Sequence, residues 1–284
     1  MYTDLHIHSW YSDGTYSPEE IINKARSQNV TTISICDHNM IDAYTKTKEL
    51  CGVKDIKIIP GVEITSVFDD KEFHILAYNF DMGNKALNDL LQYNRNIYHE
   101  MGNILIGNIA KDYPQLSITE YANYERNRKN GGWDSIDYLR SKGLVTDWES
   151  YIEIASKYGS PPDNDFMPPE EVIKIVHDAG GIAVLAHLCH HVMADIADWE
   201  RNALQFLHMG IDGFECYYPA CSTEITKFLV GFCHEHGLLI TAGSDDHGGF
   251  IGAPGEEYYI GAVRVGEIKS PLLIYNYKRS CQAK

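Results

Sequence analysis

The chain has 284 residues, of which 44% are hydrophobic and 23% are charged, and its formal net charge is −16. This composition is typical of a folded globular protein, and the negative charge disfavours binding to a nucleic-acid backbone. No apolar run is long enough for a transmembrane helix, and the first residues lack the basic and apolar regions of a signal peptide. Seven cysteines without a C-x-x-C pair are typical of free thiols. We therefore expect a cytoplasmic protein.

The first eighty residues alternate between predicted strands and helices. Residues 3–8 read as a short strand, and Ser17-Pro-Glu-Glu20 forms a capping box that starts a helix. The elements expected next are a strand at 31–36, a helix at 41–50, strands at 56–59 and 62–65 on either side of Pro60-Gly61, and a strand at 73–78.

Residues 83–165 read as helices with polar connections, and no strand is expected there. The alternation then returns, with helices at 168–180, 198–208 and 222–236 and strands at 182–186, 213–216, 238–242 and 258–265. Alternating strands and helices are typical of parallel β/α units, and this number of units favours a barrel. We expect an α/β barrel formed by 1–82 and 166–284, with 83–165 inserted as a helical domain.

Histidine and acidic side chains lie at or near the ends of most predicted strands. His6 and His8 are two residues apart, so a strand would direct both imidazoles to the same face. On this stretch alone, a pair of hydrogen-bonded core histidines is an equal alternative to a metal site. Functional sites in parallel β/α folds form at the carboxyl ends of strands. Nine candidate metal ligands occupy such positions: His6, His8, Asp13, His38, Glu63, His74, His187, Asp245 and His247. Buried polar groups without partners are costly, so the set as a whole predicts a multinuclear metal site.

The ordered motifs closely resemble those of the PHP (polymerase and histidinol phosphatase) family. They are DLHIHSWYSDG at 4–14, CDH at 36–38, GVE at 61–63, His74, AH at 186–187 and GSDDH at 243–247. The helical segment is similar to the one in stand-alone phosphoesterases of the TrpH/YciV group. The resemblance implies a distorted seven-stranded β/α barrel that holds two to three divalent ions (Mn, Zn or Fe), capped by the insertion at 83–165.

The resemblance also implies how the ligands are shared. His6, His8, Glu63 and Asp245 would bind one ion; Asp13, His38 and His247 a second; and Glu63, His74 and His187 a third. Three dications against three carboxylates leave a local charge of about +3, which would attract a phosphate despite the acidic exterior. Asp245 is the candidate for handling the proton of a bridging hydroxide, or it is a ligand alone. Asp37 would support a ligand or be structural.

The sequence departs from the family pattern after His187. Leu188 stands where the relatives often have proline, and Cys189-His190-His191 follows. The two histidines are candidates for the substrate pocket, although ordinary loop residues are the simpler interpretation. Cys189 is a remote candidate for a metal ligand.

A second departure concerns the residues that would hold the substrate. Gly132 stands where the relatives have an arginine suited to binding a substrate phosphate. Trp133 could stack on a ring of the substrate or pack at the start of a helix. The candidates to supply a cation instead are Arg95, Arg140, Lys142 and Arg201, and the short basic run Arg126-Asn-Arg-Lys129 reads as a solvated helix end or loop.

The function expected from these features is a metal-dependent phosphoesterase acting through a metal-bridging hydroxide. Its substrate would be a small phosphorylated metabolite, such as a nucleotide, a cyclic phosphodiester, or a sugar or amino-alcohol phosphate, rather than a nucleic-acid polymer or a membrane. The sequence contains no G-x-S-x-G elbow and no P-loop. The alternatives are a PHP-type exonuclease, which the charge disfavours, a non-catalytic metal-binding or regulatory module, which the complete ligand set disfavours, and a C–N hydrolase.

Overall fold

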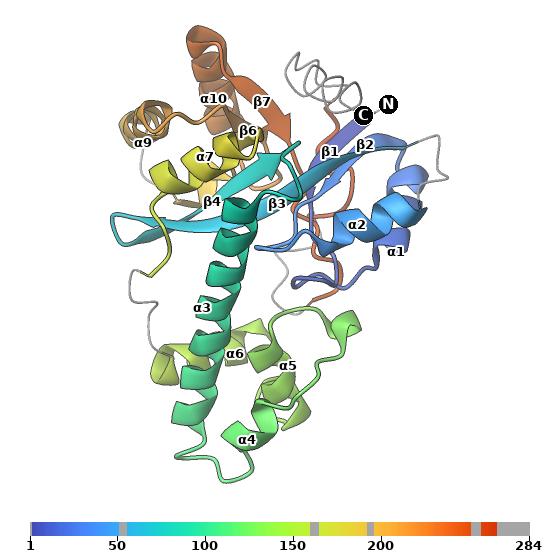
Figure 1. The fold of residues 1–284 in the computed structure, drawn as a ribbon, viewed down its shortest axis with the longest axis vertical. Helices are drawn as coiled ribbons and strands as arrows, with labels where there is room; N and C mark the ends of the chain where they lie inside the picture. Colours follow the sequence, from blue (N-terminus) through green and yellow to red (C-terminus); the bar gives the residue numbers. More distant parts are fainter. Residues whose placement is uncertain (1, 51–55, 160–164, 192–195, 251–256, 266–284) are drawn as a thin grey trace.

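A computed structural model of the chain describes residues 2–50, 56–159, 165–191, 196–250 and 257–265. Seven strands form one sheet in the order of the sequence (Figure 1). They are β1 Tyr2–Ile7, β2 Val30–Ile35, β3 Lys57–Phe68, β4 Lys71–Tyr78, β5 Ile182–Leu185, β6 Gly213–Tyr217 and β7 Leu239–Ala242. The predicted α/β class is confirmed.

The sheet is mostly parallel, but β4 runs antiparallel to both β3 and β5. A turn at Asp69 and Asp70 joins β3 to β4, and both residues have positive φ, at 50° and 58°. Two residues with positive φ form the tight turn that suits a hairpin, whereas a parallel partner needs a crossover of a dozen or more residues. The parallel β/α arrangement predicted from the alternation of strands and helices therefore does not extend to β4.

The two strands predicted at 56–59 and 62–65 form a single strand, β3, which changes its partner at Gly61. Residues 57–60 pair in parallel with β2, and residues 61–68 pair antiparallel with β4. Pro60 has no N–H to donate to a ladder, and the change of partner falls directly after it. Gly61 lies so close to β2 that a Cβ on it would be 2.1 Å from Oγ of Ser34 and 2.7 Å from Sγ of Cys36.

The two edges of the sheet approach each other without forming a ladder. One isolated bridge joins Ile7 to Asp246, and two backbone hydrogen bonds flank it: His8 N–H donates to Asp246 O (3.0 Å), and Asp245 N–H to His6 O (2.8 Å). Over the described residues the sheet is not closed, so the expected barrel is not confirmed. The strand predicted at 258–265 is wrong: these residues form turns, with Ala262 N–H bonded to Tyr259 O at 2.7 Å.

Helices connect most of the strands along the chain and pack against the sheet. They are α1 Pro18–Ser27, α2 Asp42–Leu50, α7 Pro169–Asp178, the short α8 Leu188–His191, α9 Ile196–His208 and α10 Thr223–His236. The capping box predicted at Ser17 and Glu20 is present at the start of α1. The largest hydrophobic cluster joins β3–β6 to α7, α9 and α10, with Phe73 against Phe206 at 5.0 Å between ring centroids. This packing holds the strand ends, and the side chains on them, in a fixed arrangement.

Between β4 and α7 the described residues are helical, as predicted. The elements are α3 Lys85–Ile109, α4 Ile118–Tyr121, a 3-10 turn Arg128–Asn130, α5 Asp134–Ser141 and α6 Trp148–Tyr158. Figure 1 shows α3 starting beside the sheet and extending away from it, with α4–α6 gathered around its far half. A separate hydrophobic cluster there includes Leu105, Ile106, Tyr138 and Leu139. We refer to residues 102–158 as the helical lobe.

The helices of the described residues include none that is both long enough and apolar enough to cross a membrane. The longest, α3, has 25 residues and carries polar side chains along its whole length.

The close approach at Gly61 makes a substitution there a test of the partner exchange in β3. Gly61→Ala is expected to lower the free energy of unfolding by about 1–3 kcal/mol, because Ser34 is fully buried and its hydroxyl must move. Gly107→Ala is the control, because a Cβ added there would have nothing within 4 Å. Replacing this helical glycine by alanine should raise the free energy of unfolding by about 0.5–1 kcal/mol. Urea unfolding measures both, and equal stability of the two variants would contradict the packing described.

Candidate metal centre

Glu63, on β3, is fully buried and surrounded by imidazoles. Five imidazole nitrogens lie 2.9–3.3 Å from its carboxylate: Oε2 faces His6 Nε2, His8 Nε2 and His38 Nδ1, and Oε1 faces His74 Nδ1 and His187 Nε2. His6 lies near the end of β1 and His74 within β4, whereas His8, His38 and His187 lie in the segments that follow β1, β2 and β5. The exchange of partners in β3 therefore places one carboxylate among ligands from both halves of the sheet.

The nine predicted ligands lie in one cluster. Eight of them form three groups whose donor atoms lie within 4.8 Å of one another: His6, His8, Glu63 and Asp245; His8, Asp13, His38 and His247; and His38, Glu63 and His74. The ninth, His187, belongs to none of these groups, although its Nε2 lies 3.0 Å from Oε1 of Glu63. The first group has the membership expected from the resemblance, and the second adds His8. The third has His38 where His187 was expected, but His187 Nε2 lies 3.4 Å from His74 Nδ1. How the ligands are shared among ions stays a prediction.

Opposite charges dominate the electrostatics of the cluster. Burial acts to raise the pKa of Glu63, yet the nearby imidazoles of His74 and His38 lower that pKa well below its usual range. Burial acts to lower the pKa of His8, and its contacts with Asp13 and Asp245 raise that pKa well above the usual value. In the absence of metal, protons on the imidazole rings balance the charge of the buried carboxylates. A divalent ion can replace those protons, because metal binding releases them from the ligands.

Two observations test whether the residues fit divalent ions. Oε2 of Glu63 and Nδ1 of His38 are buried and form no hydrogen bond, although they lie only 3.1 Å apart. Nδ1 of His6 lies 3.1 Å from Oε1 of Glu215. An ionised carboxylate only accepts, so in the neutral imidazole the proton belongs on Nδ1 and the lone pair on Nε2. That Nε2 faces the Nε2 of His8 at 3.2 Å. A mixed set of imidazole and carboxylate donors with lone pairs facing inward fits Zn, Mn or Fe.

Glu215, on β6, was missed by the sequence analysis. Its Oε1 contacts His6 Nδ1, and its Oε2 accepts the backbone N–H of His187 at 3.0 Å. His187 has φ 26°, outside the regions that most residues adopt, so this bond helps to hold an unfavourable backbone. A signal was present in the sequence: Glu215 is the one charged residue of the strand GFECY, and a buried carboxylate requires partners.

Tyr218 was also missed, and it orients Asp245. Its hydroxyl donates to Oδ2 of Asp245 at 2.9 Å, while Oδ1 of the same carboxylate lies 3.0 Å from His8 Nε2. Asp245 has φ 55°. One oxygen of Asp245, Oδ2, therefore accepts a hydrogen bond from Tyr218, and the other, Oδ1, faces the cluster.

Asp37, for which two roles were open, is structural. It accepts hydrogen bonds from the Ser9 N–H (2.7 Å), the Ser9 hydroxyl (2.6 Å) and the Ser12 hydroxyl (2.7 Å). These residues belong to the loop between β1 and α1 that carries Asp13. Asp37 thus holds that loop rather than the ring of its neighbour His38.

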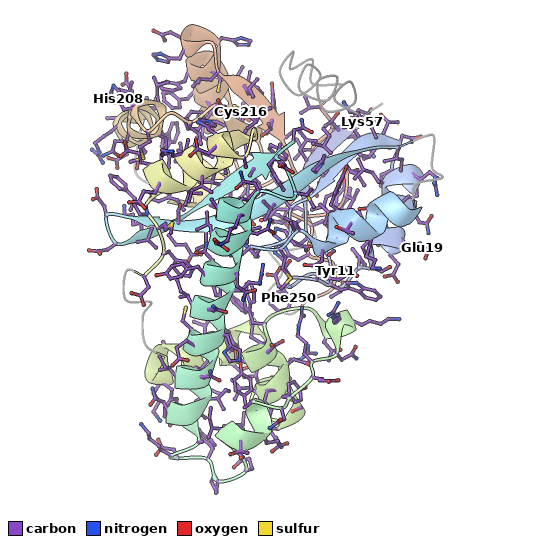
Figure 2. All side chains as sticks on the ribbon, viewed as in Figure 1. Tyr11, Glu19, Lys57, His208, Cys216 and Phe250 are labelled. Atoms are coloured by element: carbon purple, nitrogen blue, oxygen red, sulfur yellow. The ribbon has the colours of Figure 1, made fainter. Side chains whose placement is uncertain are left out.

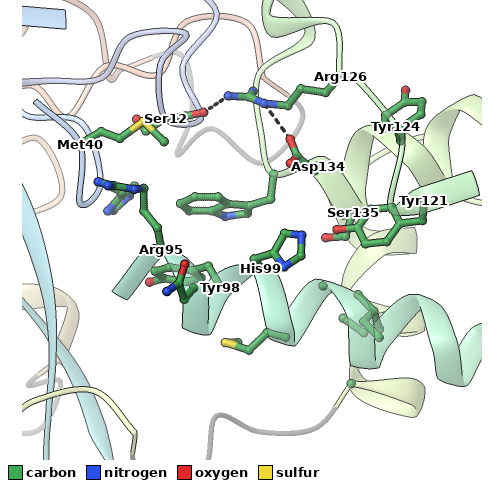
Figure 3. A pocket seen from close by; sticks show the side chains of 18 of the residues that line it. Ser12, Met40, Arg95, Tyr98, His99, Tyr121, Tyr124, Arg126, Asp134 and Ser135 are labelled. Carbon is green, nitrogen blue, oxygen red and sulfur yellow. Dashed lines mark hydrogen bonds and ion pairs between the residues drawn. The ribbon is translucent and has the colours of Figure 1, made fainter. Parts of the chain in front are cut away.

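A cavity of about 1130 Å³ opens beside His38, between the sheet and the helical lobe (Figure 3). The indole of Trp133 stacks on the ring of Tyr98, with centroids 4.8 Å apart and planes at 9°. The same indole lies 5.6 Å from the ring of His38. Trp133 therefore lines the cavity and packs at the start of α5, so both roles considered for it are compatible with its position.

The cations of the cavity are mostly not the predicted ones. Arg95 lines it, but Arg140, Lys142 and Arg201 do not; Lys142 pairs with Glu120, and Arg201 with Asp198. Arg126 and Arg128, which were read as solvated, both line the cavity, and the side chain of Arg126 is only 11% exposed. The guanidinium of Arg128 lies over the ring of Tyr11, 5.0 Å from its centroid.

The remaining departures from the family pattern concern Gly132, Cys189 and the two histidines after it. A Cβ on Gly132 (φ 72°) would lie 2.5 Å from Cε2 of Phe250, so no side chain fits there. Figure 2 shows Phe250 and Tyr11 where the sheet meets the helical lobe. Cys189 belongs to none of the three ligand groups; its Sγ contacts that of Cys221 at 2.6 Å. The side chains of His190 and His191 lie outside the described part of the structure.

The chain belongs to the PHP domain family, whose model matches residues 4–235. Its structural relatives include a protein from Bifidobacterium adolescentis provisionally described as a metal-dependent phosphoesterase, with a TM-score of 0.80, 23% identity and 96% coverage of each chain. An amidohydrolase from Chromobacterium violaceum has a TM-score of 0.74 at 22% identity, with 97% coverage of each chain. At these identities the likeness concerns the fold.

Curated relatives carry several activities. The 5'-3' exoribonuclease Rnm of Salmonella typhimurium is 26% identical over 264 residues, covering 86% of this chain and 84% of the relative. The 3',5'-nucleoside bisphosphate phosphatase of Chromobacterium violaceum is 26% identical over 270 residues, with coverage of 89% and 88%. The phosphoribosyl 1,2-cyclic phosphate 1,2-diphosphodiesterase of Eggerthella lenta is 22% identical over 288 residues, with coverage of 89% and 97%. The relatives therefore share hydrolysis of phosphate esters, not one substrate.

Because Glu63 belongs to two of the three ligand groups, its substitution should remove more than one ion. We expect Glu63→Gln to lower the bound Mn, measured by elemental analysis after dialysis, to at most one ion per chain. Glu120→Gln is the control: it makes the same substitution in the helical lobe, away from the cluster, and should retain the wild-type Mn content. Unchanged Mn in Glu63→Gln would show that this carboxylate is not a ligand.

Proposed function

We propose that this chain is a metal-dependent phosphoesterase whose substrate carries a flat ring, as a nucleotide does. The observation that carries the proposal is that His38 belongs to both the ligand cluster and the cavity. Its Nδ1 lies 3.1 Å from Glu63 Oε2, and its ring lies 5.6 Å from the indole of Trp133. A phosphate at the cluster would therefore place the rest of its molecule beside that indole.

The nine ligands supply the chemistry by holding two to three divalent ions, of Mn, Zn or Fe. When bound, such ions polarise a phosphoryl oxygen and lower the pKa of a coordinated water. They also offset the negative charge of the chain locally, so that an anionic ester is attracted to this one region of an acidic protein. A dinuclear arrangement would use fewer of the same residues.

Asp245 has the position of a ligand that can also accept a proton. Its Oδ1 faces His6 Nε2 at 3.3 Å and His8 Nε2 at 3.0 Å, whereas its Oδ2 is held by the Tyr218 hydroxyl. The hydrogen bond from Tyr218 fixes the carboxylate plane, so Oδ1 keeps its direction toward the cluster. We assign to Asp245 a place among the residues that would hold an ion, and its carboxylate would accept the proton released on hydrolysis.

The helical lobe would cap the centre and recognise the part of the substrate beyond the phosphate. Base stacking on an aromatic side chain tolerates any base, which suits the indole of Trp133. Arg95 and Arg128 line the same cavity and could contact further phosphates. The volume of about 1130 Å³ exceeds the roughly 300–1,000 Å³ of ordinary small-molecule pockets. The cavity thus has room for more than a mononucleotide.

That room favours a second candidate, a 5'-3' exoribonuclease that removes nucleotides from short RNA. Curated relatives at 25–26% identity have this name, including the one from Escherichia coli. The net charge of −16 opposes binding to long RNA, but it does not prevent a short oligonucleotide from entering a cavity with its own arginines. A comparison of 5'-phosphorylated oligoribonucleotides of two to ten residues with a nucleoside 3',5'-bisphosphate separates the two candidates.

Asp245→Asn should abolish turnover of whichever phosphoester is preferred. We expect phosphate or nucleotide release by the Mn-loaded variant to fall by about 10²–10⁴-fold, the usual contribution of a proton-transfer group. The matched control, Asp178→Asn, removes an exposed partner of Lys174 and should keep the wild-type rate. Full turnover by Asp245→Asn with its metals bound would reject the assigned role. Wild-type protein that binds metal but releases nothing from any phosphoester would favour a C–N hydrolase or a non-catalytic module.

Trp133→Ala should weaken substrate binding more than the chemical step. Loss of one stacked base costs about 1–3 kcal/mol, so KM is expected to rise at least about 5-fold, with kcat within a factor of three. Trp133→Phe keeps an aromatic face and should recover most of the affinity. Trp148→Ala, on the exposed side of α6, is the control and should leave KM unchanged. A fall in kcat at constant KM would contradict a role in holding the substrate.

A further inference from the structure

Arg126 joins the helical lobe to the loop that carries Asp13. Its Nη2 donates to the carbonyl oxygens of Trp10 (3.2 Å) and Ser12, and its Nη1 donates to Gly132 O at 2.8 Å. Its Nε pairs with Asp134 at 3.1 Å. Figure 3 shows the guanidinium between Ser12 and Asp134. Four of the five guanidinium N–H groups are therefore engaged, which leaves little capacity for a ligand although Arg126 lines the cavity.

A fifth contact strengthens the same connection. The N–H of Gly132 donates to the carbonyl oxygen of Asp13 at 2.6 Å. Three hydrogen bonds thus cross from the segment 126–132 to the backbone of residues 10–13, which are more than one hundred positions away in the sequence. Because the acceptors are carbonyls of a loop, the bonds fix where that loop lies and do not depend on its side chains.

The loop ends at a predicted metal ligand. The carboxylate of Asp13 lies 3.4 Å from His247 Nε2 and 3.5 Å from His8 Nδ1, and all three belong to the second ligand group. On its inner side the loop is held by Asp37 through Ser9 and Ser12. Arg126 supplies the hold on its outer side. The loop that carries Asp13 is therefore held from two places, the segment after β2 and the helical lobe.

We propose that Arg126 is a positioning residue that sets the affinity of the second ligand group by holding Asp13 from the helical lobe. The proposal rests on the metal centre proposed above. It couples the two parts of the site: the contacts that place Trp133 in the cavity, through Gly132 and Asp134 on either side of it, also place Asp13 at the cluster. Lysine can replace this arginine only in part, because its three N–H groups leave from one atom and cannot reach acceptors on several sides at once.

The test is a stepwise titration of the metal-free full chain with Mn²⁺. The concentration of free Mn²⁺ at each step is measured from its electron paramagnetic resonance signal. Groups that orient metal ligands typically change affinity by about 10–100-fold. In Arg126→Gln one Mn²⁺ should bind about 10–100-fold more weakly, while ions held without Asp13 keep their wild-type affinity. In Arg126→Lys the affinity for that ion should lie between those of the wild type and Arg126→Gln. Lys142→Gln removes a lobe cation that has no contact with the loop and should titrate as the wild type.

A double variant makes the inference specific to Asp13. Asp13→Asn alone should weaken the same single ion, and adding Arg126→Gln should then change the titration little, because both act through one ligand. Thermal unfolding of each metal-free variant confirms that it is folded. Wild-type affinities in Arg126→Gln, or equal weakening of all ions, would overturn the positioning role while leaving the metal centre intact. Failure of the wild-type chain to bind Mn²⁺ would overturn both.

Discussion

A buried carboxylate surrounded by imidazoles is the constraint on which the rest of the structure depends. Glu63 is fully enclosed and has five imidazole nitrogens within 3.3 Å. An isolated charge in such a place would cost many kcal/mol, so the carboxylate can stay ionised only with cations around it. The exchange of partners in β3 after Pro60 brings Glu63 to this point, and at Gly61, where the exchange occurs, a Cβ would meet Ser34 and Cys36 of β2 and the segment after it.

The cluster is supported by contacts from β6 and from the residue that follows it. Glu215 holds His6 and the backbone of His187, and Tyr218 holds Asp245. His187 and Asp245 have positive φ, a conformation that costs about 1–3 kcal/mol for each residue. Such strain persists only where surrounding bonds determine the backbone, and its presence at two ligands indicates that ligand position takes precedence over local stability at this site.

The sequence predicted which side chains lie together better than it predicted the framework around them. Histidines and carboxylates near strand ends can be recognised as motifs in the sequence. Because the carboxyl ends of β/α strands meet at one edge, such motifs predict side chains that lie together. The direction of β4 depends on a two-residue turn between long strands, and Asp69-Asp70 carries no glycine to mark it. Glu215 and Arg126 act across more than one hundred residues of sequence, so nothing beside them in the chain indicates their partners. Their roles follow from the packing of elements that are distant in the sequence.

The most direct test of the metal centre is a crystal of the Mn-loaded protein with anomalous diffraction measured on both sides of the Mn absorption edge. Two or three anomalous peaks should lie among the nine side chains, with at least one peak at coordination distance, about 2.0–2.3 Å, from Glu63. Crystals with full density for Glu63 and its five imidazoles but no anomalous peak among them would contradict the centre. They would show instead that protons shared between rings and carboxylates hold the cluster together.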